Sequence, residues 1–394
     1  MKRLFDLGQF PIGCAALIAM LVLSRLAQAQ GFEVLYSFPG GNSGAYPTGA
    51  PLQDKAGNLY GVTAGTYVGQ NVQGSVLFKL EPDGTESVLY SFQGGSDGDT
   101  PAAGVIADKA GSFYGVTIYG GQYGCGVAYK VTPAGSETVL RDFDPATDGC
   151  QPFAGLTIDG KGNLYGTTSS AGPIGGTVFE LKPSGREKIL HSFPTGANDG
   201  WQPAGNLLRD SFGNLYGTTV DGGINCGGSG CGTVFKIAPD GTETVLYAFK
   251  GPPDGAHSYS NIVADKAGNL YGTTFDGGGT DCKCGTIFKV TPAGVGTTLY
   301  SFCGCLDGGL PSGNVVLDKE GNLYGTTLTD GQFFSGTVWK LKPDGHFVVL
   351  YSLNSSGNSG DSPVGVIIGS NGNLFGQGSG AGQFGYGTVF SLPR

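Results

Sequence analysis

The stretch Gly162-Asn163-Leu164-Tyr165-Gly166-Thr167-Thr168 decides the fold, because near-copies of it recur along most of the chain. Successive copies lie 51 to 55 residues apart, which is the length of one repeating unit. Repeats of this length indicate small units that bury their cores against one another. The tyrosine position of the motif recurs at Tyr60, Tyr114, Tyr165, Tyr216, Tyr271, Tyr324 and Phe375.

Each repeat reads as four short β-strands, with no sustained helical period. Apolar residues alternate on both faces of these strands, and turns such as Pro239-Asp240-Gly241 separate them. Within one unit we expect strands at about Gly205–Arg209, Leu215–Thr219, Gly232–Ile237 and Glu243–Phe249. Four strands per repeat of about 50 residues predict an all-β fold, a seven-bladed β-propeller of four-stranded antiparallel blades. The tyrosine of the motif is expected to fill space between neighbouring sheets.

The two ends of the repeat array predict how the ring closes. After the leader, the chain starts with a fourth strand at Phe32–Phe38, and its last strand is a third strand at Thr388–Leu392. We therefore expect the N-terminal strand to pair with the C-terminal blade, which leaves no sheet edge exposed. Residues 30–394 are interpreted as a single propeller domain.

The first 29 residues have the pattern of a Sec-type signal peptide. Lys2 and Arg3 precede an apolar run at Ile12–Leu23, and Ala27-Gln28-Ala29 forms a small-residue cleavage site. An uncleaved anchor is the alternative, although the apolar run is short for a membrane span. The pattern predicts cleavage after Ala29, a secreted or periplasmic protein, and no membrane span afterwards.

Composition and charge exclude one class of partner. The chain has a formal net charge of −9 at pH 7 and a pI near 4.8, whereas binding to nucleic acid requires a basic surface. The 75 glycines and 21 prolines approach the composition of a disordered chain, but they occupy fixed places in the repeat. We expect an ordered protein, a monomer, with a protein or a glycan as its partner.

Function is expected at one end of the ring. The loop between second and third strands and the crossing from each fourth strand to the next blade lie at the same end, here called the long-loop end. Irregular loops on a rigid scaffold are the usual place for binding. This end is also acidic, with Asp97, Asp99, Asp144, Asp148, Asp199, Asp221, Asp254, Asp276, Asp281, Asp307, Asp330 and Asp361 in its loops.

An Asp-Gly-x-x-Pro pattern recurs in the crossings and supplies most of the candidate site. A ring of these carboxylates would bind a divalent cation such as calcium, or cationic groups of a ligand. The alternative is structural and is favoured, because aspartate before glycine is ordinary turn chemistry. No other cofactor is expected, and metal binding stays open. The candidate ligand-binding residues are Asp97, Asp148, Asp199, Asp254, His257, Asp307 and Asp361.

Cysteine number and export together predict disulfides. Of nine cysteines, Cys14 lies in the leader, which leaves an even number in an exported protein. We expect Cys125 to pair with Cys150, which ties a long loop to the next crossing, and Cys226 to pair with Cys231 of the same loop. Zinc binding by the remaining four is less favoured, since ligand spacing is usually wider than Cys-x-Cys. Pairing stays open among Cys282, Cys284, Cys303 and Cys305.

Catalytic signatures are sparse, and we assign no catalytic residue. The sequence has no Gly-x-Ser-x-Gly, His-Glu-x-x-His or phosphate-binding loop in a suitable context. Of three histidines, His191 and His346 belong to strands, and only His257 lies at the candidate end. A glycoside hydrolase needs two suitably spaced carboxylates, which the loops offer without specificity. Loop aromatics suited to stacking on sugars are Tyr46, Tyr123, Trp201, Tyr259 and Phe333.

The repeat resembles the bacterial Gloeo_Verruco (GloVer) repeat over nearly the whole mature chain. The resemblance rests on Gly-Asn-Leu-Tyr-Gly-Thr-Thr, Gly-Thr-Val-Phe-Lys-Leu, Pro-Asp-Gly and Val-Leu-Tyr-Ser-Phe. It implies an exported bacterial repeat protein and brings no catalytic residue with it. Our interpretation is an exported scaffold that binds a protein or glycan through its acidic long-loop end. The alternatives are a carbohydrate-active lyase or hydrolase on that end, and a structural cell-surface protein.

Overall fold

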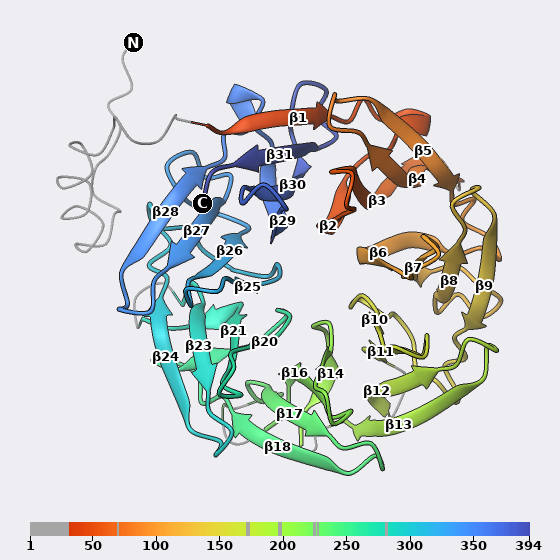
Figure 1. The fold of residues 1–394 in the computed structure, drawn as a ribbon. Helices are drawn as coiled ribbons and strands as arrows, with labels where there is room; N and C mark the ends of the chain where they lie inside the picture. Colours follow the sequence, from red (N-terminus) through yellow and green to blue (C-terminus); the bar gives the residue numbers. More distant parts are fainter. Residues whose placement is uncertain are drawn as a thin grey trace.

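The computed structural model describes residues 31–68, 71–170, 174–195, 199–223, 226, 228–279 and 283–394. These residues form seven radial blades of four antiparallel strands in a closed ring (Figure 1). Apart from two single-turn 3-10 helices, the described residues contain no helix. The predicted all-β seven-bladed propeller is confirmed. The predicted signal peptide lies outside the described residues.

The blades follow one another in chain order around the ring. Blade 1 contains β2 (Pro47–Gln53), β3 (Leu59–Val68), β4 (Asn71–Leu80) and β5 (Glu86–Ser91). Blade 2 contains β6 (Asp99–Ala107), β7 (Phe113–Tyr119), β8 (Val127–Val131) and β9 (Glu137–Asp142). Blade 3 contains β10 (Thr157–Ile158), β11 (Leu164–Thr168), β12 (Ile174–Leu181) and β13 (Glu187–Pro194). Blade 4 contains β14 (Trp201–Pro203), β15 (Leu208–Arg209), β16 (Leu215–Asp221), β17 (Thr233–Ile237) and β18 (Glu243–Ala248).

The remaining blades keep this order, and the innermost strands of blades 5 and 6 are only two residues long. Blade 5 contains β20 (Val263–Ala264), β21 (Leu270–Thr274), β23 (Thr286–Val290) and β24 (Gly296–Ser301), beside the small pair β19 (Gly255–Ala256) and β22 (Asp276–Gly277). Blade 6 contains β25 (Val316–Leu317), β26 (Leu323–Thr327), β27 (Thr337–Leu341) and β28 (Phe347–Ser352). Blade 7 contains β29 (Asp361–Ile368), β30 (Leu374–Gly380), β31 (Thr388–Leu392) and β1 (Glu33–Ser37).

The outermost strand of blade 7 comes from the N-terminal side of the chain, as predicted. Strand β1 pairs antiparallel with β31, with Glu33 opposite Ser391 and Ser37 opposite Thr388. Figure 1 shows this first strand lying beside the last one. Just before β1, the Phe32 ring stacks on Tyr351 of blade 6 with centroids 3.7 Å apart. Ring closure therefore combines backbone pairing with packing between blades.

The repeated motif forms the second strand of each blade, and its residues have separate tasks. In blade 3, Leu164 is buried, and Gly166 lies opposite Phe179 of the third strand. Tyr165 belongs to a buried cluster with Phe193 of its own blade and Leu207 of blade 4, as expected for a residue between sheets. Its hydroxyl has a second task that the pattern did not predict, because it lies 3.2 Å from Asp159 Oδ2 in the adjoining turn.

The core lies between blades. In one buried cluster, Val116 and Ala128 of blade 2 pack on Leu156, Leu164 and Phe179 of blade 3. Aromatic and β-branched side chains on both sheet faces account for these contacts, because each sheet is covered by two neighbours. The hydrophobic effect thus holds the blades side by side.

Asparagine side chains tie the innermost strands together. Asn206 Oδ1 accepts a hydrogen bond from the Gly155 amide of the preceding blade at 2.5 Å. Asn314 Oδ1 accepts from the Val366 amide of the following blade at 2.9 Å. These bonds satisfy backbone donors that would otherwise be unpaired beside the ring axis. The long-loop end is therefore supported by a rigid ring.

Candidate functional site

Several candidate aspartates of the crossings form hydrogen bonds that hold the loop against the preceding strand. We call these residues fasteners. Asp254 Oδ2 accepts hydrogen bonds from the Tyr247 hydroxyl at 2.7 Å and from the Lys250 amide at 3.1 Å. The partner tyrosine lies on the outer strand of the same blade. Each fastener therefore joins the start of a crossing to the strand that precedes it. The same arrangement recurs for Asp97 with Tyr90 and Gln93, and for Asp307 with Tyr300 and Cys303.

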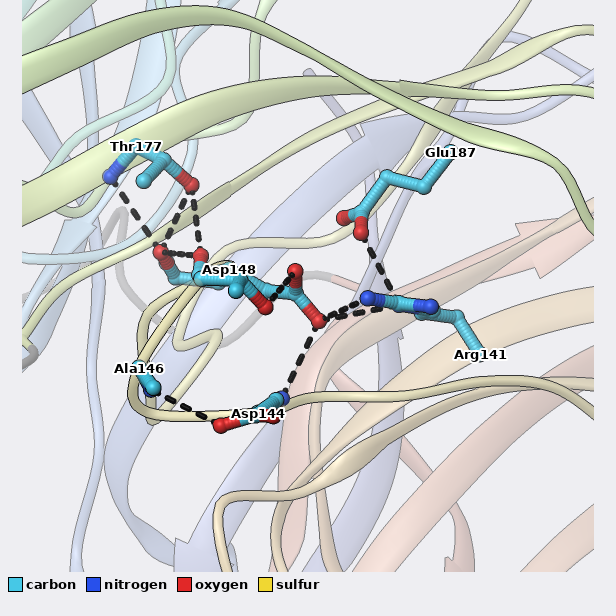
Figure 2. Close-up of polar contacts among 8 residues, drawn as sticks. Arg141, Asp144, Ala146, Asp148, Thr177 and Glu187 are labelled. Carbon is cyan, nitrogen blue, oxygen red and sulfur yellow. Dashed lines mark hydrogen bonds and ion pairs between the residues drawn. The ribbon is translucent and has the colours of Figure 1, made fainter.

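Asp148 uses an arginine where these crossings use a tyrosine (Figure 2). Arg141 Nε donates to Asp148 Oδ2 at 2.9 Å, and the Asp144 amide donates to the same oxygen at 3.0 Å. Arg141 also forms a 2.9 Å ion pair with Glu187 of blade 3. Burial acts to raise the pKa of Asp148, but the Asp144 amide, the Thr147 hydroxyl and Arg141 outweigh it and lower that pKa. This carboxylate is paired and buried inside the protein.

The other two candidate aspartates have different surroundings. Asp199 Oδ2 lies 3.6 Å from His191 Nε2 of the preceding outer strand. Asp361 begins β29 and pairs in register with Gly380. Within the described residues, no three or more His, Cys, Asp and Glu side chains are arranged to hold a metal ion. The contacts thus favour the structural interpretation of the Asp-Gly motif, and a ligand role for these carboxylates stays a prediction.

Two of the candidate aspartates, Asp97 and Asp199, lie near a glutamate of the following blade. Burial, with the nearby Asp97 carboxylate, raises the pKa of Glu137 to about 7. Burial, with Asp199, likewise raises the pKa of Glu243 to about 7. One carboxylate oxygen of each glutamate is buried without a hydrogen-bond partner. These glutamates therefore favour the protonated form in the folded ring.

His257 is the candidate residue that lies between two carboxylates. Its Nδ1 lies 2.9 Å from Asp276 Oδ2, and its Nε2 lies 3.6 Å from Asp221 Oδ1. Ser229 donates to Asp221 Oδ1 at 2.8 Å. Burial and then the two carboxylates raise the pKa of the neighbouring Tyr259. With its side chain 30% exposed, His257 is held by two carboxylates at an accessible place in the long-loop end.

His257 also belongs to a ring of seven equivalent residues with unusual backbone. Each lies where a crossing enters the innermost strand, and each has a left-handed φ between 45° and 58°. Left-handed backbone costs a non-glycine residue about 1–2 kcal/mol. Every side chain in this left-handed ring is at least partly exposed. The left-handed ring consists of Tyr46, Thr100, Gln151, Gln202, His257, Leu310 and Ser362.

Hydrogen bonds to two blades hold members of this ring in place. The His257 amide donates to Cys231 O of blade 4 at 3.0 Å, and its carbonyl accepts from the Phe275 amide of blade 5 at 2.9 Å. The same two-sided pairing recurs at Tyr46, Gln151 and Leu310. These bonds to the surrounding blades thus fix the left-handed conformation. Strained backbone persists only where the surrounding structure holds it in this way.

Exposed aromatic side chains also gather at the long-loop end. Twelve large hydrophobic side chains are exposed among the described residues, and the eight in or directly beside the long loops and crossings are all aromatic. The turns at the opposite end expose only two of the twelve, Phe212 and Val295. The eight are Tyr46, Tyr119, Tyr123, Phe153, Tyr259, Phe333, Phe334 and Phe384.

Two of the predicted disulfides are confirmed, Cys125 with Cys150 and Cys226 with Cys231. Both lie in long loops and crossings, and such bonds fit an extracellular or periplasmic protein. Cys305 is also disulfide-bonded. Since Cys282 lies outside the described residues, the pairing within the last cysteine set stays a prediction.

Sequence reasoning missed the carboxylate partners of His257 and the left-handed ring. Asp276 begins β22 and Asp221 ends β16, so sequence spacing alone does not bring them to the histidine. The left-handed ring does have one signal in the sequence, because six of its seven members directly precede a proline.

A polar hollow of about 260 Å³, lined in part by Asn42, Gln73 and Gln93, also lies in blade 1 at the long-loop end. No helix in the described part of the chain is long and apolar enough to span a membrane.

Comparisons with known proteins identify the fold and the family. Virginiamycin B lyase from Staphylococcus aureus is 12% identical with a TM-score of 0.58, and the match covers 92% of this chain and 99% of the lyase. The extracellular domain of a one-component system from B. thetaiotaomicron is 13% identical with a TM-score of 0.55. That match covers 91% of this chain but 40% of the other. At these identities the likeness shows the fold alone.

No curated protein matches the sequence. The model of the Gloeobacter/Verrucomicrobia repeat matches residues 22–229 and 224–394, which together span most of the sequence. These are also the residues that carry the Gly-Asn-Leu-Tyr-Gly motif and its seven blades. The protein therefore belongs to the Gloeobacter/Verrucomicrobia repeat family.

Proposed function

We propose that this protein is an exported binding scaffold whose long-loop end holds a glycan or a protein. The observation that carries the proposal is the gathering of eight exposed aromatic side chains at one end of the ring. Exposed apolar groups collected on one surface mark interaction sites, and aromatic residues contribute much of the energy of such contacts. The rigid ring beneath them limits the entropy lost on binding.

The test compares aromatic residues at the two ends of the ring. Residues 30–394 are applied to a glycan array and to immobilised candidate proteins, together with the variants Tyr123→Ala and Phe384→Ala. Phe212→Ala is the matched control, because Phe212 is 84% exposed at the opposite end. We expect the two long-loop variants to weaken binding at least tenfold and the control to bind normally. Equal binding by all three variants would remove the proposal.

A carbohydrate-active enzyme on the same end is the second candidate, favoured by His257. A histidine whose Nδ1 is held by a carboxylate has part of the arrangement of a general base. Asp276 lies 2.9 Å from Nδ1, while Nε2 faces Asp221. If the protein is an enzyme, His257→Ala abolishes product release from a polysaccharide that the intact chain degrades. Binding without turnover on every polysaccharide tested leaves the scaffold as the better proposal.

A further inference from the structure

The left-handed ring keeps side chains at positions where glycine would fit the backbone without strain. Glycine adopts positive φ freely, and it occupies many other left-handed positions of this chain. All seven ring positions nevertheless carry a side chain, and they comprise six residue types, with only Gln151 and Gln202 alike. A residue needed only for the repeated blade structure would be expected to repeat with it. This variation points to a task performed by the side chains.

The seven side chains are rich in hydrogen-bonding groups. The ring carries amides, hydroxyls, one imidazole and one aliphatic chain, and it has no Asp, Glu, Lys or Arg. Hydroxyl and amide groups both donate and accept hydrogen bonds. They match a ligand covered with hydroxyl groups, which also donate and accept. The ring therefore differs from the acidic crossings that surround it.

We propose that the left-handed ring is a binding site for a neutral oligosaccharide. The sugar hydroxyls exchange hydrogen bonds with Gln151, Gln202 and their counterparts, and the exposed aromatic rings stack on the sugar faces. Hydrogen bonds from two blades hold ring members such as His257 before the ligand arrives, which reduces the ordering needed on binding. This inference rests on the proposed function and names its ligand class.

The test uses glycine, which relieves the backbone while removing the side chain. Residues 30–394 are titrated calorimetrically with cellohexaose, maltohexaose, laminarihexaose and xylohexaose, and with hexagalacturonate and a glucosamine hexamer as charged comparators. The double variant Gln151→Gly/Gln202→Gly is expected to lose at least tenfold in affinity for the neutral hexamer that binds, at an unchanged or higher melting temperature. Asn358→Gly is the matched control, because Asn358 is exposed with a φ of 63° outside the ring. That control should bind normally.

The outcomes separate this inference from the proposed function. Binding of charged hexamers alone, or of none, overturns the neutral-oligosaccharide site, and so does full affinity in the double glycine variant. If that variant binds normally while Tyr123→Ala and Phe384→Ala do not, the aromatic binding surface is supported. The left-handed ring is then excluded as the oligosaccharide site. If the double variant melts lower, Gln202→Glu decides, since it keeps the side-chain shape and adds a charge. Its normal affinity would overturn the inference, and its loss of affinity would support it.

Discussion

Gly166 lies directly opposite Phe179 across β11 and β12, and a Cβ at position 166 would come within 2.6 Å of Phe179 Cζ. Because the glycine of the repeated motif has no side chain, it leaves the space that a core aromatic ring fills. Gly166→Ala should overpack this site and destabilise the fold by about 1–3 kcal/mol. Chemical denaturation followed by circular dichroism measures the change. Gly160→Ala, which meets nothing within 4 Å, should be nearly neutral, and equal losses in both variants would contradict this packing account.

Removal of β1 should open the ring. A chain that begins at residue 40 lacks both the strand paired with β31 and Phe32, which stacks on Tyr351. We expect a lower melting temperature and association through the exposed edge of β31. Light scattering and thermal melts on this chain and on residues 30–394 make the comparison. A shortened chain that is equally stable and monomeric would show that the strand is not needed for closure.

The boundary glutamates predict a stability that falls as pH rises. The pKa values of Glu137 and Glu243 are raised to about 7 in the folded protein, so folding favours their protonated forms. Their contribution is complete below the ordinary carboxyl pKa and is lost as pH rises through about 7. The melting temperature should therefore decrease between pH 5 and pH 7.5.

The control for this pH dependence removes the titrating groups. Glu137→Gln/Glu243→Gln keeps the shape of both side chains and should give a shallower slope over the same interval. Thermal melts of both proteins in matched ionic strength provide the measurement. An unchanged slope would assign the pH dependence to other groups.

The disulfide between Cys125 and Cys150 should stabilise the fold more than the one between Cys226 and Cys231. The first bond joins residues 25 apart and the second joins residues 5 apart. Loop-entropy arguments give about 3 kcal/mol for the longer loop and about 2 kcal/mol for the shorter. Paired serine variants, unfolded by denaturant without reductant, test the order. The opposite order would indicate that contacts in the native loops outweigh chain entropy.

Asp254→Ala should reduce stability without reducing ligand affinity. The substitution leaves the Tyr247 hydroxyl and the Lys250 amide without their acceptor, at a cost of about 2 kcal/mol. Asp240→Ala, in an exposed turn at the other end, should change stability little. Denaturation curves and binding titrations are measured on the same samples. Normal stability with lost binding would instead make Asp254 a ligand-binding residue.

The fold could be predicted because its determinants repeat in the sequence. Seven copies of one motif gave the number of blades, and Phe32–Phe38 matched the fourth strand that the last repeat lacked. The site was harder to predict because its determinants do not repeat. Asp276 reaches His257 from β22, and the left-handed φ of His257 is held by hydrogen bonds to two blades. Asp254 was identified as a candidate from its motif, yet its hydrogen bonds to Tyr247 and Lys250 could be seen only in three dimensions.

The pairing of β1 with β31 also bears on the order in which parts of the fold form. Both strands must be present together, because blade 7 takes its outermost strand from one end of the described chain and its other three strands from the other end. Contacts this distant in sequence form late, after the cost of closing a long loop. Until then the incomplete ring has two open strand edges and is vulnerable to association and to proteases. Only a chain that keeps both terminal strands can complete blade 7 and cover those edges. A chain that is cut short at either end therefore remains open to association and proteolysis.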